Sequence, residues 1–291
     1  MLPKKPLPHN LVVQKVRVGD IELCNPVMPA SGTFGFGYEL ADRLPVHKLG
    51  AIVTKAVTLK PRPGNPPPRA QETPCGMLNS VGLENPGLEV FLSDILPRIK
   101  GLGPPVIVNI AGERASDYLA LAQALDRADG VSGLEVNVSC PNVEAGTEFG
   151  RNHAALEALV RELRAKTSKP IWVKLTPFLT DVVSEAKAAE RGGADALVVA
   201  NTYKGLWVRE DGSEFTGGLS GPAIMPLTLF LVRAVSSAVG IPVIGVGGIR
   251  QAADVRRYLQ AGAAAVQVGT GNLVDPACMF RILEEMGYNL G

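Results

Sequence analysis

Short runs of apolar, mostly β-branched residues recur along the chain, and amphipathic stretches separate most of them. The runs are 26–31, 51–56, 106–112, 134–140, 171–177, 196–202, 242–248 and 265–271. Between them, stretches such as 152–167 and 251–263 carry apolar residues at the i, i+3, i+4 and i+7 positions of a helix. Alternating strands and helices predict a parallel sheet, and eight such units predict a (β/α)8 barrel of the α/β class. A doubly wound sheet is the alternative, but it does not normally need eight strands.

Two further segments extend this architecture. Residues 11–23 predict a β-hairpin ahead of the barrel, because Gly19-Asp20 separates two alternating runs. Residues 60–87 are rich in proline and too long for an ordinary connector, so we expect an ordered loop over the C-terminal face that covers the substrate. No linker or change of composition divides the chain, and we therefore expect residues 1–291 to form one domain.

Each predicted strand ends in a polar residue or a glycine turn. These endings are Ser31, Lys55, Asn109, Asn137 with Cys140, Lys174, Asn201-Thr202, Gly247-Gly248 and Gly269-Thr270. In a parallel barrel all such endings open onto one face, where active sites lie. The two lysines favour a ligand site, because a buried ammonium needs a partner. The alternative is that they extend to solvent or pair with an internal acid such as Glu135.

The glycine turns after the last two strands favour a bound phosphate. Backbone N–H groups in such turns can cradle an anion, and the loops after strands seven and eight usually hold phosphate in this type of barrel. Turns without a ligand are the alternative. No G-x-G-x-x-G motif opens a strand–helix–strand unit, so a dinucleotide site is not supported. The motif "GTFGFG" at 32–37 is interpreted as a loop that approaches a ligand closely.

The stretch "LEVNVSCPN" at 134–142 supplies the candidate acid or base. None of the three histidines lies at a strand end, whereas Cys140 precedes the proline that ends a predicted strand. A thiol can take a carbon-bound proton more readily than a hydroxyl can. A packing role is the alternative. Asn79, Asn137 and Asn201 would suit a planar ring edged with C=O and N–H groups, such as a pyrimidine, and a role in turns is the alternative. For Asn85 we prefer a role in a turn.

Composition narrows the class of protein. The net charge is +1, so no basic surface favours nucleic acid as a partner. No apolar run reaches the length of a membrane span, and the N-terminus does not resemble a secretory signal. The four cysteines form no C-x-x-C pair, which argues against a disulfide framework, a zinc site or an iron–sulfur cluster. We therefore expect a cytoplasmic enzyme without a metal.

Seven motifs, in order along the chain, resemble those of family 1 dihydroorotate dehydrogenases. They are "NPVMPASGTFGFG", "TPCGMLNSVGLENPG", "VNVSCPN", "VKLTP", "GGLSGPA", "VGGI" and "VGTG". The resemblance implies an FMN-containing barrel that oxidises (S)-dihydroorotate to orotate in de novo pyrimidine biosynthesis. It implies that Cys140 takes the C5 proton while the C6 hydride passes to the flavin.

The resemblance also implies roles for the other site residues. Lys55 would contact both flavin and substrate, and so would Asn137. The substrate would further contact Asn79, Ser80, Val81, Gly82, Leu83, Asn201 and Thr202. The flavin would further contact Ser31, Ala56, Asn109, Lys174, Ala200, Gly221, Gly247, Gly248, Gly269 and Thr270.

"PASGTFGFG" and "NSVGLENPG" resemble the B-type enzymes. This implies a homodimer of barrels with an FAD- and iron–sulfur-containing partner subunit that passes electrons to NAD⁺. The fumarate-reducing A-type is the close alternative, and a dihydropyrimidine dehydrogenase-like enzyme is a second one that lacks its iron–sulfur cysteines here. More distant alternatives are a tRNA dihydrouridine synthase, a flavin-free barrel lyase or aldolase with a Schiff base on Lys55 or Lys174, and a non-catalytic binding module.

Overall fold

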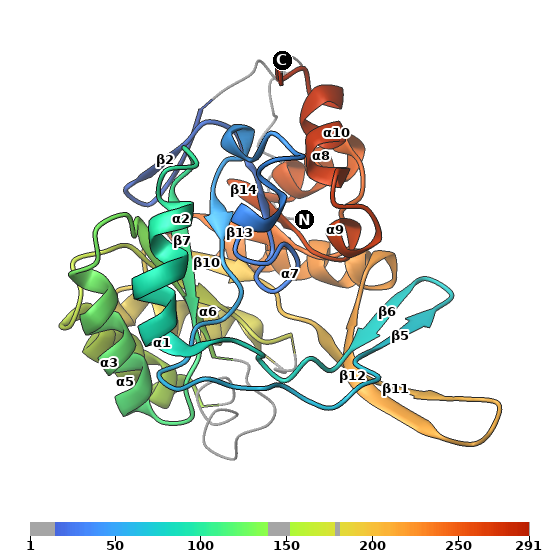
Figure 1. The fold of residues 1–291 in the computed structure, drawn as a ribbon, viewed down its shortest axis with the longest axis horizontal. Helices are drawn as coiled ribbons and strands as arrows, with labels where there is room; N and C mark the ends of the chain where they lie inside the picture. Colours follow the sequence, from blue (N-terminus) through green and yellow to red (C-terminus); the bar gives the residue numbers. More distant parts are fainter. Residues whose placement is uncertain (1–14, 139–151, 178–180, 291) are drawn as a thin grey trace.

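The computed structural model describes residues 15–138, 152–177 and 181–290, and within them eight parallel strands form a nearly closed barrel (Figure 1). The order around the sheet is β3-β14-β13-β10-β9-β8-β7-β4. The strands are β3 (Val27–Pro29), β4 (Ile52–Val53), β7 (Val106–Ile110), β8 (Gly133–Asn137), β9 (Ile171–Lys174), β10 (Ala196–Val199), β13 (Val243–Val246) and β14 (Ala265–Val268). Between β3 and β4 the Gly50 N–H donates to the Val27 carbonyl at 2.9 Å. The predicted (β/α)8 architecture is confirmed, with every predicted strand in place.

Helices surround this sheet (Figure 1). They are α1 (Gly87–Val90), which continues through a π-helical turn (Phe91–Ile95) into α2 (Leu96–Ile99), α3 (Ala115–Asp126), α5 (His153–Arg164), α6 (Val182–Gly192), α7 (Met225–Ser236), α8 (Ala252–Ala261), α9 (Thr270–Val274) and α10 (Cys278–Glu285). The helices predicted at 152–167 and 251–263 are confirmed as α5 and α8. The Asn152 side chain caps α5 by accepting from two backbone N–H groups, and left-handed Gly262 ends α8.

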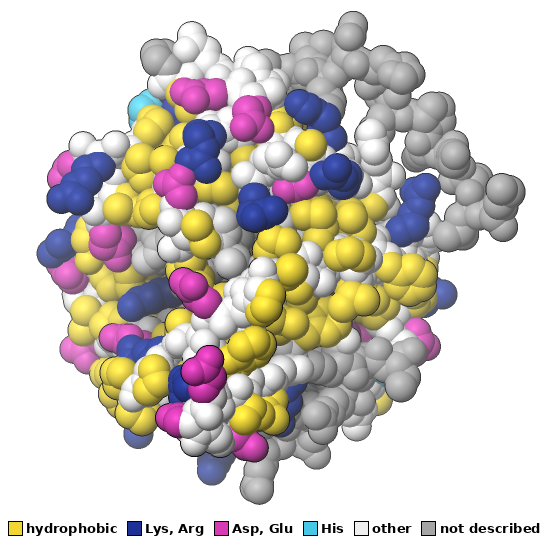
Figure 2. Space-filling view, turned by 90° about the vertical axis from the view of Figure 1, so that its right-hand side faces the viewer, with side chains coloured by type: hydrophobic (Ala, Val, Ile, Leu, Met, Phe, Trp, Pro, Cys, Tyr) yellow, Lys and Arg dark blue, Asp and Glu magenta, His cyan; other side chains and the backbone are white. Residues whose placement is uncertain are grey.

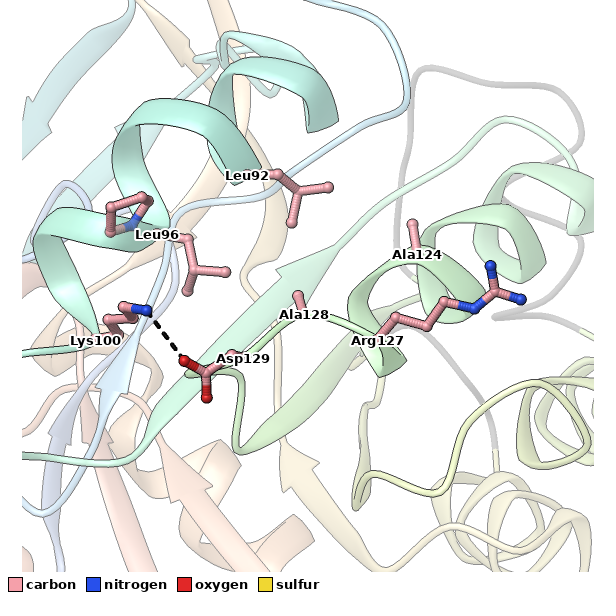
Figure 3. Close-up of a pocket in the computed structure, with 8 residues that line it drawn as sticks. Leu92, Leu96, Lys100, Ala124, Arg127, Ala128 and Asp129 are labelled. Carbon is pink, nitrogen blue, oxygen red and sulfur yellow. Dashed lines mark hydrogen bonds and ion pairs between the residues drawn. The ribbon is translucent and has the colours of Figure 1, made fainter.

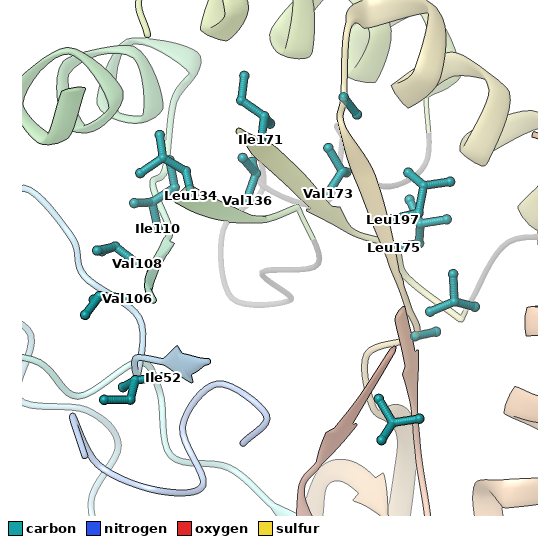
Figure 4. Packing of buried hydrophobic residues seen from close by; sticks show 14 of the residues in the cluster. Ile52, Val106, Val108, Ile110, Leu134, Val136, Ile171, Val173, Leu175 and Leu197 are labelled. Carbon is teal, nitrogen blue, oxygen red and sulfur yellow. The ribbon is translucent and has the colours of Figure 1, made fainter. Parts of the chain in front are cut away.

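Alternation along the strands separates two layers of the core. Val106, Val108 and Ile110 of β7 belong to the cluster packed against the helices, and Figure 4 shows them beside the corresponding residues of β8 and β9. Ile107, between them, belongs to a second cluster inside the barrel. Because side chains alternate across a strand, Asn109 shares the inner side with Ile107. The inner side is thus apolar near the N-terminal ends of the strands and polar near their C-terminal ends.

The N-terminal hairpin closes the apolar end of the barrel. It consists of β1 (Val16–Val18) and β2 (Ile21–Leu23), joined across Gly19-Asp20 as predicted, while residues 11–14 of the predicted hairpin lie outside the described residues. Val18, Ile21 and Leu23 are buried in the same cluster as the inner residues of the strands. Access to the barrel interior is therefore expected from the opposite, C-terminal end.

A four-stranded antiparallel sheet lies at that C-terminal end. Its order is β11-β12-β6-β5, from β5 (Ala70–Thr73), β6 (Gly76–Asn79), β11 (Tyr203–Val208) and β12 (Glu214–Ser220). In Figure 1 both hairpins project to one side of the barrel. The segment expected as a long loop at 60–87 is thus partly strand, and the hairpin at 203–220 was not expected. β11 begins at the residue after Thr202, so this sheet adjoins the predicted site.

The surface carries charges of both signs among hydrophobic side chains, as the face in Figure 2 shows. The most exposed large apolar side chains include Phe230 of α7 and Val274 of α9. None of the helices in the described ranges has the length and apolar character needed to span a bilayer.

Candidate active site

The polar strand endings singled out in the sequence lie together at the C-terminal end of the barrel. Asn137 and Lys174 are the last residues of β8 and β9, and Asn109 is the last but one of β7. All three are buried. Strand register pairs Asn137 with Lys174. Ser31, Lys55 and Asn201-Thr202 follow β3, β4 and β10, with Ala56 and Ala200 buried beside them. Cys140 lies outside the described residues.

Lys174 pairs with an internal acid. Its Nζ lies 3.6 Å from Glu135 Oε1, 3.2 Å from Ser31 Oγ and 3.5 Å from Gln267 Oε1. The side chains of Lys174 and Glu135 are 6% and 0% exposed. The alternative considered for the strand-end lysines, a pairing with Glu135, therefore applies to Lys174. The contact with Ser31 is within ordinary hydrogen-bond range, whereas those with Glu135 and Gln267 are longer.

Two amide side chains complete the environment of Glu135. Asn109 Nδ2 donates to Glu135 Oε1 at 2.7 Å, and Gln267 Nε2 donates to Glu135 Oε2. The other atom of the first amide, Asn109 Oδ1, is buried without a hydrogen-bond partner. A buried unpaired acceptor is costly, so this atom marks a place where a ligand donor fits. Gln267 was not predicted as a site residue, although a lone polar residue on the inner side of an apolar strand is a usable signal.

Lys55 has a different environment from Lys174. Its ammonium lies 5.1 Å from the centre of the Phe36 ring, and no acidic side chain in the described ranges forms an ion pair with it. Its backbone N–H donates to Gly35 O at 3.1 Å, which holds the "GTFGFG" loop against the end of β4. Lys55 is thus a cation at the mouth of the barrel whose charge is available to an anionic ligand.

A pair of asparagines joins neighbouring strand ends. Asn201 Nδ2 donates to Asn137 Oδ1 at 3.3 Å, and Asn201 Oδ1 accepts from the Thr202 N–H at 2.8 Å. Tyr118 OH donates to the Asn137 carbonyl at 2.8 Å. These contacts fix both amides at the polar end of the barrel.

The predicted substrate loop begins where β6 meets β12. Asn79 Nδ2 donates to Gly218 O at 3.1 Å. Asn65 holds the next residue, because its Nδ2 donates to Ser80 O at 3.0 Å and to Ser80 Oγ at 2.9 Å. Within the stretch Val81, Gly82 and Leu83, Leu83 has a φ of 57°, an uncommon conformation for a residue with a side chain. The loop is therefore built into a specific shape beside the mouth of the barrel.

The turn role predicted for Asn85 is confirmed. Asn85 is buried, and its Oδ1 accepts from the Gly87 N–H at 2.9 Å. Its Nδ2 donates to Thr58 Oγ1 and to Leu83 O, each at 2.8 Å. The side chain thus ties the loop that contains Leu83 to the segment after β4.

Three glycine-containing turns meet at the ends of β12, β13 and β14. A Cβ on Gly248 (φ 72°) would lie 2.9 Å from Gly221 O, and a Cβ on Gly221 (φ 93°) would lie 3.4 Å from Thr270 Cγ2. Thr270 Oγ1 donates to Ser220 Oγ at 2.7 Å. A Cβ on Gly269 would meet nothing closer than Ala30 Cβ at 3.6 Å. The turns with Gly247-Gly248 and Gly269-Thr270, predicted as a phosphate site, therefore lie side by side with Gly221.

Two other features lie away from this cluster. A groove of about 300 Å³ between α2 and α3 is lined by Leu92, Leu96, Pro97, Ala124, Arg127, Ala128 and the Lys100–Asp129 ion pair (Figure 3). It contains none of the predicted site residues.

Glu185 of α6 is buried, and burial raises its pKa to about 9. Its Oε1 accepts from the Thr176 N–H at 3.4 Å, while Oε2 has no partner.

Comparisons with known proteins agree on one family. A sequence profile described as dihydroorotate dehydrogenase matches residues 13–290. The catalytic subunit of dihydroorotate dehydrogenase B (NAD(+)) from Geotalea daltonii is 48% identical over 268 residues, which cover 90% of this chain and 88% of the relative. The subunit of that name from Geobacter sp. (strain M21) is 48% identical over 277 residues (93% and 91%). That from Carboxydothermus hydrogenoformans is 47% identical over 282 residues (95% and 92%).

Proposed function

The chain belongs to the dihydroorotate dehydrogenase family, and we propose that it oxidises (S)-dihydroorotate to orotate for pyrimidine biosynthesis, with FMN as the bound acceptor. The oxidation removes a proton from C5 and a hydride from C6 of the substrate. When bound, FMN supplies the hydride acceptor. The observation that carries the proposal is the group of inward polar side chains at the C-terminal end of a barrel that is apolar elsewhere.

The phosphate of FMN fits the three glycine turns. The backbone at Gly221, Gly248 and Gly269 can approach an anion because these residues have no side chain, and Thr270 adds a hydroxyl. Substituting Gly221 or Gly248 by any other residue would fill this place, since a Cβ there would meet backbone atoms at 2.9 Å. Gly247 continues the same turn with a φ of 135°.

The ring of FMN fits the inner polar cluster. Asn109 Oδ1 is a buried acceptor without a partner, and Lys174 and Ser31 are donors at the same level of the barrel. A flavin ring presents both N–H and C=O groups along one edge, so it can pair with this set. Lys55, Ala56, Asn137 and Ala200 complete the proposed cofactor contacts.

The substrate would lie over the ring, at the mouth of the barrel. Lys55 would attract its carboxylate, because no described acid neutralises this ammonium. The amides of Asn79, Asn137 and Asn201 would bind the ring polar groups, with Thr202 beside them. The loop Ser80, Val81, Gly82 and Leu83 would cover the substrate and exclude water.

We assign proton removal to Cys140. The assignment comes from the "NVSCPN" motif, in which the thiol follows Asn137 by three positions. A thiolate is a competent base for a carbon acid near neutral pH, and histidine is not available at the described strand ends. Proton removal by this thiol would need no metal ion at the site.

A second protein would reoxidise the flavin. The relatives named above carry NAD(+) and "catalytic subunit" in their names, which supports an NAD⁺-linked enzyme with a partner subunit. This chain has no Rossmann fingerprint and no cysteine cluster for an electron relay. We therefore propose a homodimer of barrels that associates with a partner subunit containing FAD and an iron–sulfur cluster.

The acceptor assay tests this proposal. The purified chain is given dihydroorotate with an artificial redox dye, NAD⁺ or fumarate in turn. Turnover with the dye, and with neither natural acceptor, is the expected result. Rapid fumarate reduction would make the enzyme A-type, and rapid NAD⁺ reduction by the isolated chain would remove the need for a partner. No turnover with any acceptor, and no FMN released on denaturation, would contradict the proposed function.

A further inference from the structure

Glu135 is the central acceptor of the buried polar cluster, although neither motif nor position marks it as a ligand residue. It lies on the inner side of β8, between Leu134 and Val136, which face the helices (Figure 4). Its two oxygens contact three side chains: Asn109, Gln267 and Lys174. We propose that Glu135 is a positioning residue that sets the orientation of Asn109 and the place and charge balance of Lys174. This inference rests on the proposed FMN site.

Glu135 determines which way the amide of Asn109 is turned. An ionised carboxylate only accepts hydrogen bonds, so the atom of Asn109 that lies 2.7 Å from Glu135 Oε1 must be the Nδ2 donor. The reverse orientation would place two acceptors in contact. Asn109 Oδ1 must therefore face away from Glu135, where it is buried and unpartnered. Glu135 thus makes Asn109 an acceptor for an N–H group of the bound ring.

Glu135 also orients the amide of Gln267 in β14. Its Nε2 donates to Glu135 Oε2, which turns its Oε1 toward Lys174 Nζ at 3.5 Å. Gln267 is fully buried, so this orientation is set by the protein and not by solvent. The carboxylate and the amide oxygen therefore both face the ammonium of Lys174, and Ser31 lies on another side of it at 3.2 Å.

The two strand-end lysines differ in whether an acidic side chain balances their charge. Lys174 and Glu135 form a buried pair with no net charge, whereas Lys55 has no acidic partner in the described ranges. Lys174 therefore supplies a directed donor, and Lys55 supplies the net positive charge that an anionic substrate needs. Removing only one member of a buried pair leaves a charge in an apolar interior, which is far more unfavourable than removing both.

A double-mutant cycle on FMN affinity tests the orientation of Asn109. We expect Asn109→Ala to weaken FMN binding about tenfold in the parent protein, the loss of one buried hydrogen bond. In a Glu135→Gln background the amide is no longer fixed, so Asn109→Ala should cost at most about threefold. Glu22→Gln, which removes the acid of the exposed Lys15–Glu22 pair, is the matched control and should leave the tenfold effect intact. Equal effects of Asn109→Ala in both backgrounds would overturn the proposal.

The midpoint potential of the bound flavin tests the charge balance. Glu135→Gln leaves the ammonium of Lys174 uncompensated, which favours the more negative reduced flavin, so the potential should become more positive. Glu135→Asp retains the charge and should stay close to the parent, as should Glu22→Gln. An unchanged potential in Glu135→Gln, or an equal shift in Glu135→Asp, would overturn this part.

Unfolding of the apoprotein in urea tests the pairing without any cofactor. Glu135→Gln and Lys174→Met should each lower the midpoint, and the double variant should lose less than the sum of the two. If Glu135→Gln alone does not fold and the double variant does, the pairing is supported. If the losses of the two single variants add up in the double variant, or if neither Glu135→Gln nor the double variant folds, the pairing is contradicted. A parent protein that binds no FMN would instead contradict the proposed function. The urea measurements need no cofactor, so they would still test the pairing of Glu135 with Lys174.

Discussion

Asn201 Nδ2 lies 3.3 Å from Asn137 Oδ1, which joins the ends of β10 and β8 across the position of β9. Each amide thus orients the other before any ligand arrives. Such preorganisation limits the ordering that substrate binding would otherwise require. The two residues should therefore act as one unit toward the substrate.

For this pair we expect coupled losses. Asn201→Ala should lower kcat/KM for dihydroorotate about 10- to 100-fold, since a substrate group then lacks its hydrogen-bond partner. Asn137→Ala should have an effect of at least that size. The double variant should be less impaired than the product of the two single effects. Strictly multiplicative losses would show that the two amides act independently.

Lys55 and Lys100 offer a comparison of two lysines. Lys55 lacks an acidic partner in the described ranges and lies at the barrel mouth, whereas Lys100 forms an exposed ion pair with Asp129. Lys55→Ala should slow flavin reduction by dihydroorotate about 10²–10³-fold, the effect of losing a charge contact in a water-poor site. Lys100→Ala should leave the rate unchanged. Equal rates of flavin reduction in the two variants would contradict the assignment of Lys55 to the site. A borohydride-trapped adduct on Lys55 would indicate Schiff-base chemistry.

Gly248 and Gly212 both have a positive φ, near 72° and 79°. A Cβ on Gly248 would meet Met225 Cβ at 2.8 Å and Gly221 O at 2.9 Å, whereas a Cβ on Gly212 would meet nothing within 4 Å. Both alanine variants carry the backbone strain of about 1–2 kcal/mol, but only Gly248→Ala should also disturb the phosphate turns. FMN affinity should fall at least tenfold in Gly248→Ala and stay unchanged in Gly212→Ala. Unchanged affinity in both would place the phosphate elsewhere.

Glu185 should make stability depend on pH. Burial raises its pKa in the folded protein to about 9, from an ordinary value of 4.5. Between these values the folded state keeps a proton that the unfolded state has lost, so stability should fall as pH rises, by up to about 1.4 kcal/mol per pH unit. Glu185→Gln stays neutral and should flatten the decline measured by urea unfolding from pH 5 to 8. Glu162→Gln, at an exposed position, should leave this decline unchanged. Parallel declines in parent and Glu185→Gln would contradict the assignment.

The barrel and its hairpin could be predicted because their signals are local. In β7, β8 and β9 the outward residues are apolar at every second position, and in β7 and β9 the inward ones change from apolar Ile107 and Trp172 to polar Asn109 and Lys174 toward the C-terminal end. The two-residue repeat of apolar positions therefore predicts the strands, and the polar strand endings predict which end of the barrel carries the site. The glycine turns could be placed by the same reasoning.

The antiparallel sheet could not be predicted in this way. Asn79 and Gly218, which pair across it, are 139 residues apart, and both strands contain glycine. The pairs β5–β6 and β11–β12 are local hairpins, and only the pairing of β6 with β12 is distant, so that pairing leaves little pattern in the sequence of either strand. The different environments of Lys55 and Lys174 were also hidden, because both look alike as strand-end lysines. Only the fold brings Glu135 to one of them.

Anaerobic reduction of the flavin by dihydroorotate, followed as loss of visible absorbance in a stopped-flow instrument, tests the proposed role of Cys140 most directly. The parent protein should lose its flavin absorbance within a single turnover. Cys140→Ala should bind FMN equally well and react about 10²–10⁴-fold more slowly, the usual effect of losing a general base. Cys140→Ser should also be slow and should need higher pH. A parent flavin that stays oxidised, or a Cys140→Ala variant as fast as the parent, would contradict the account.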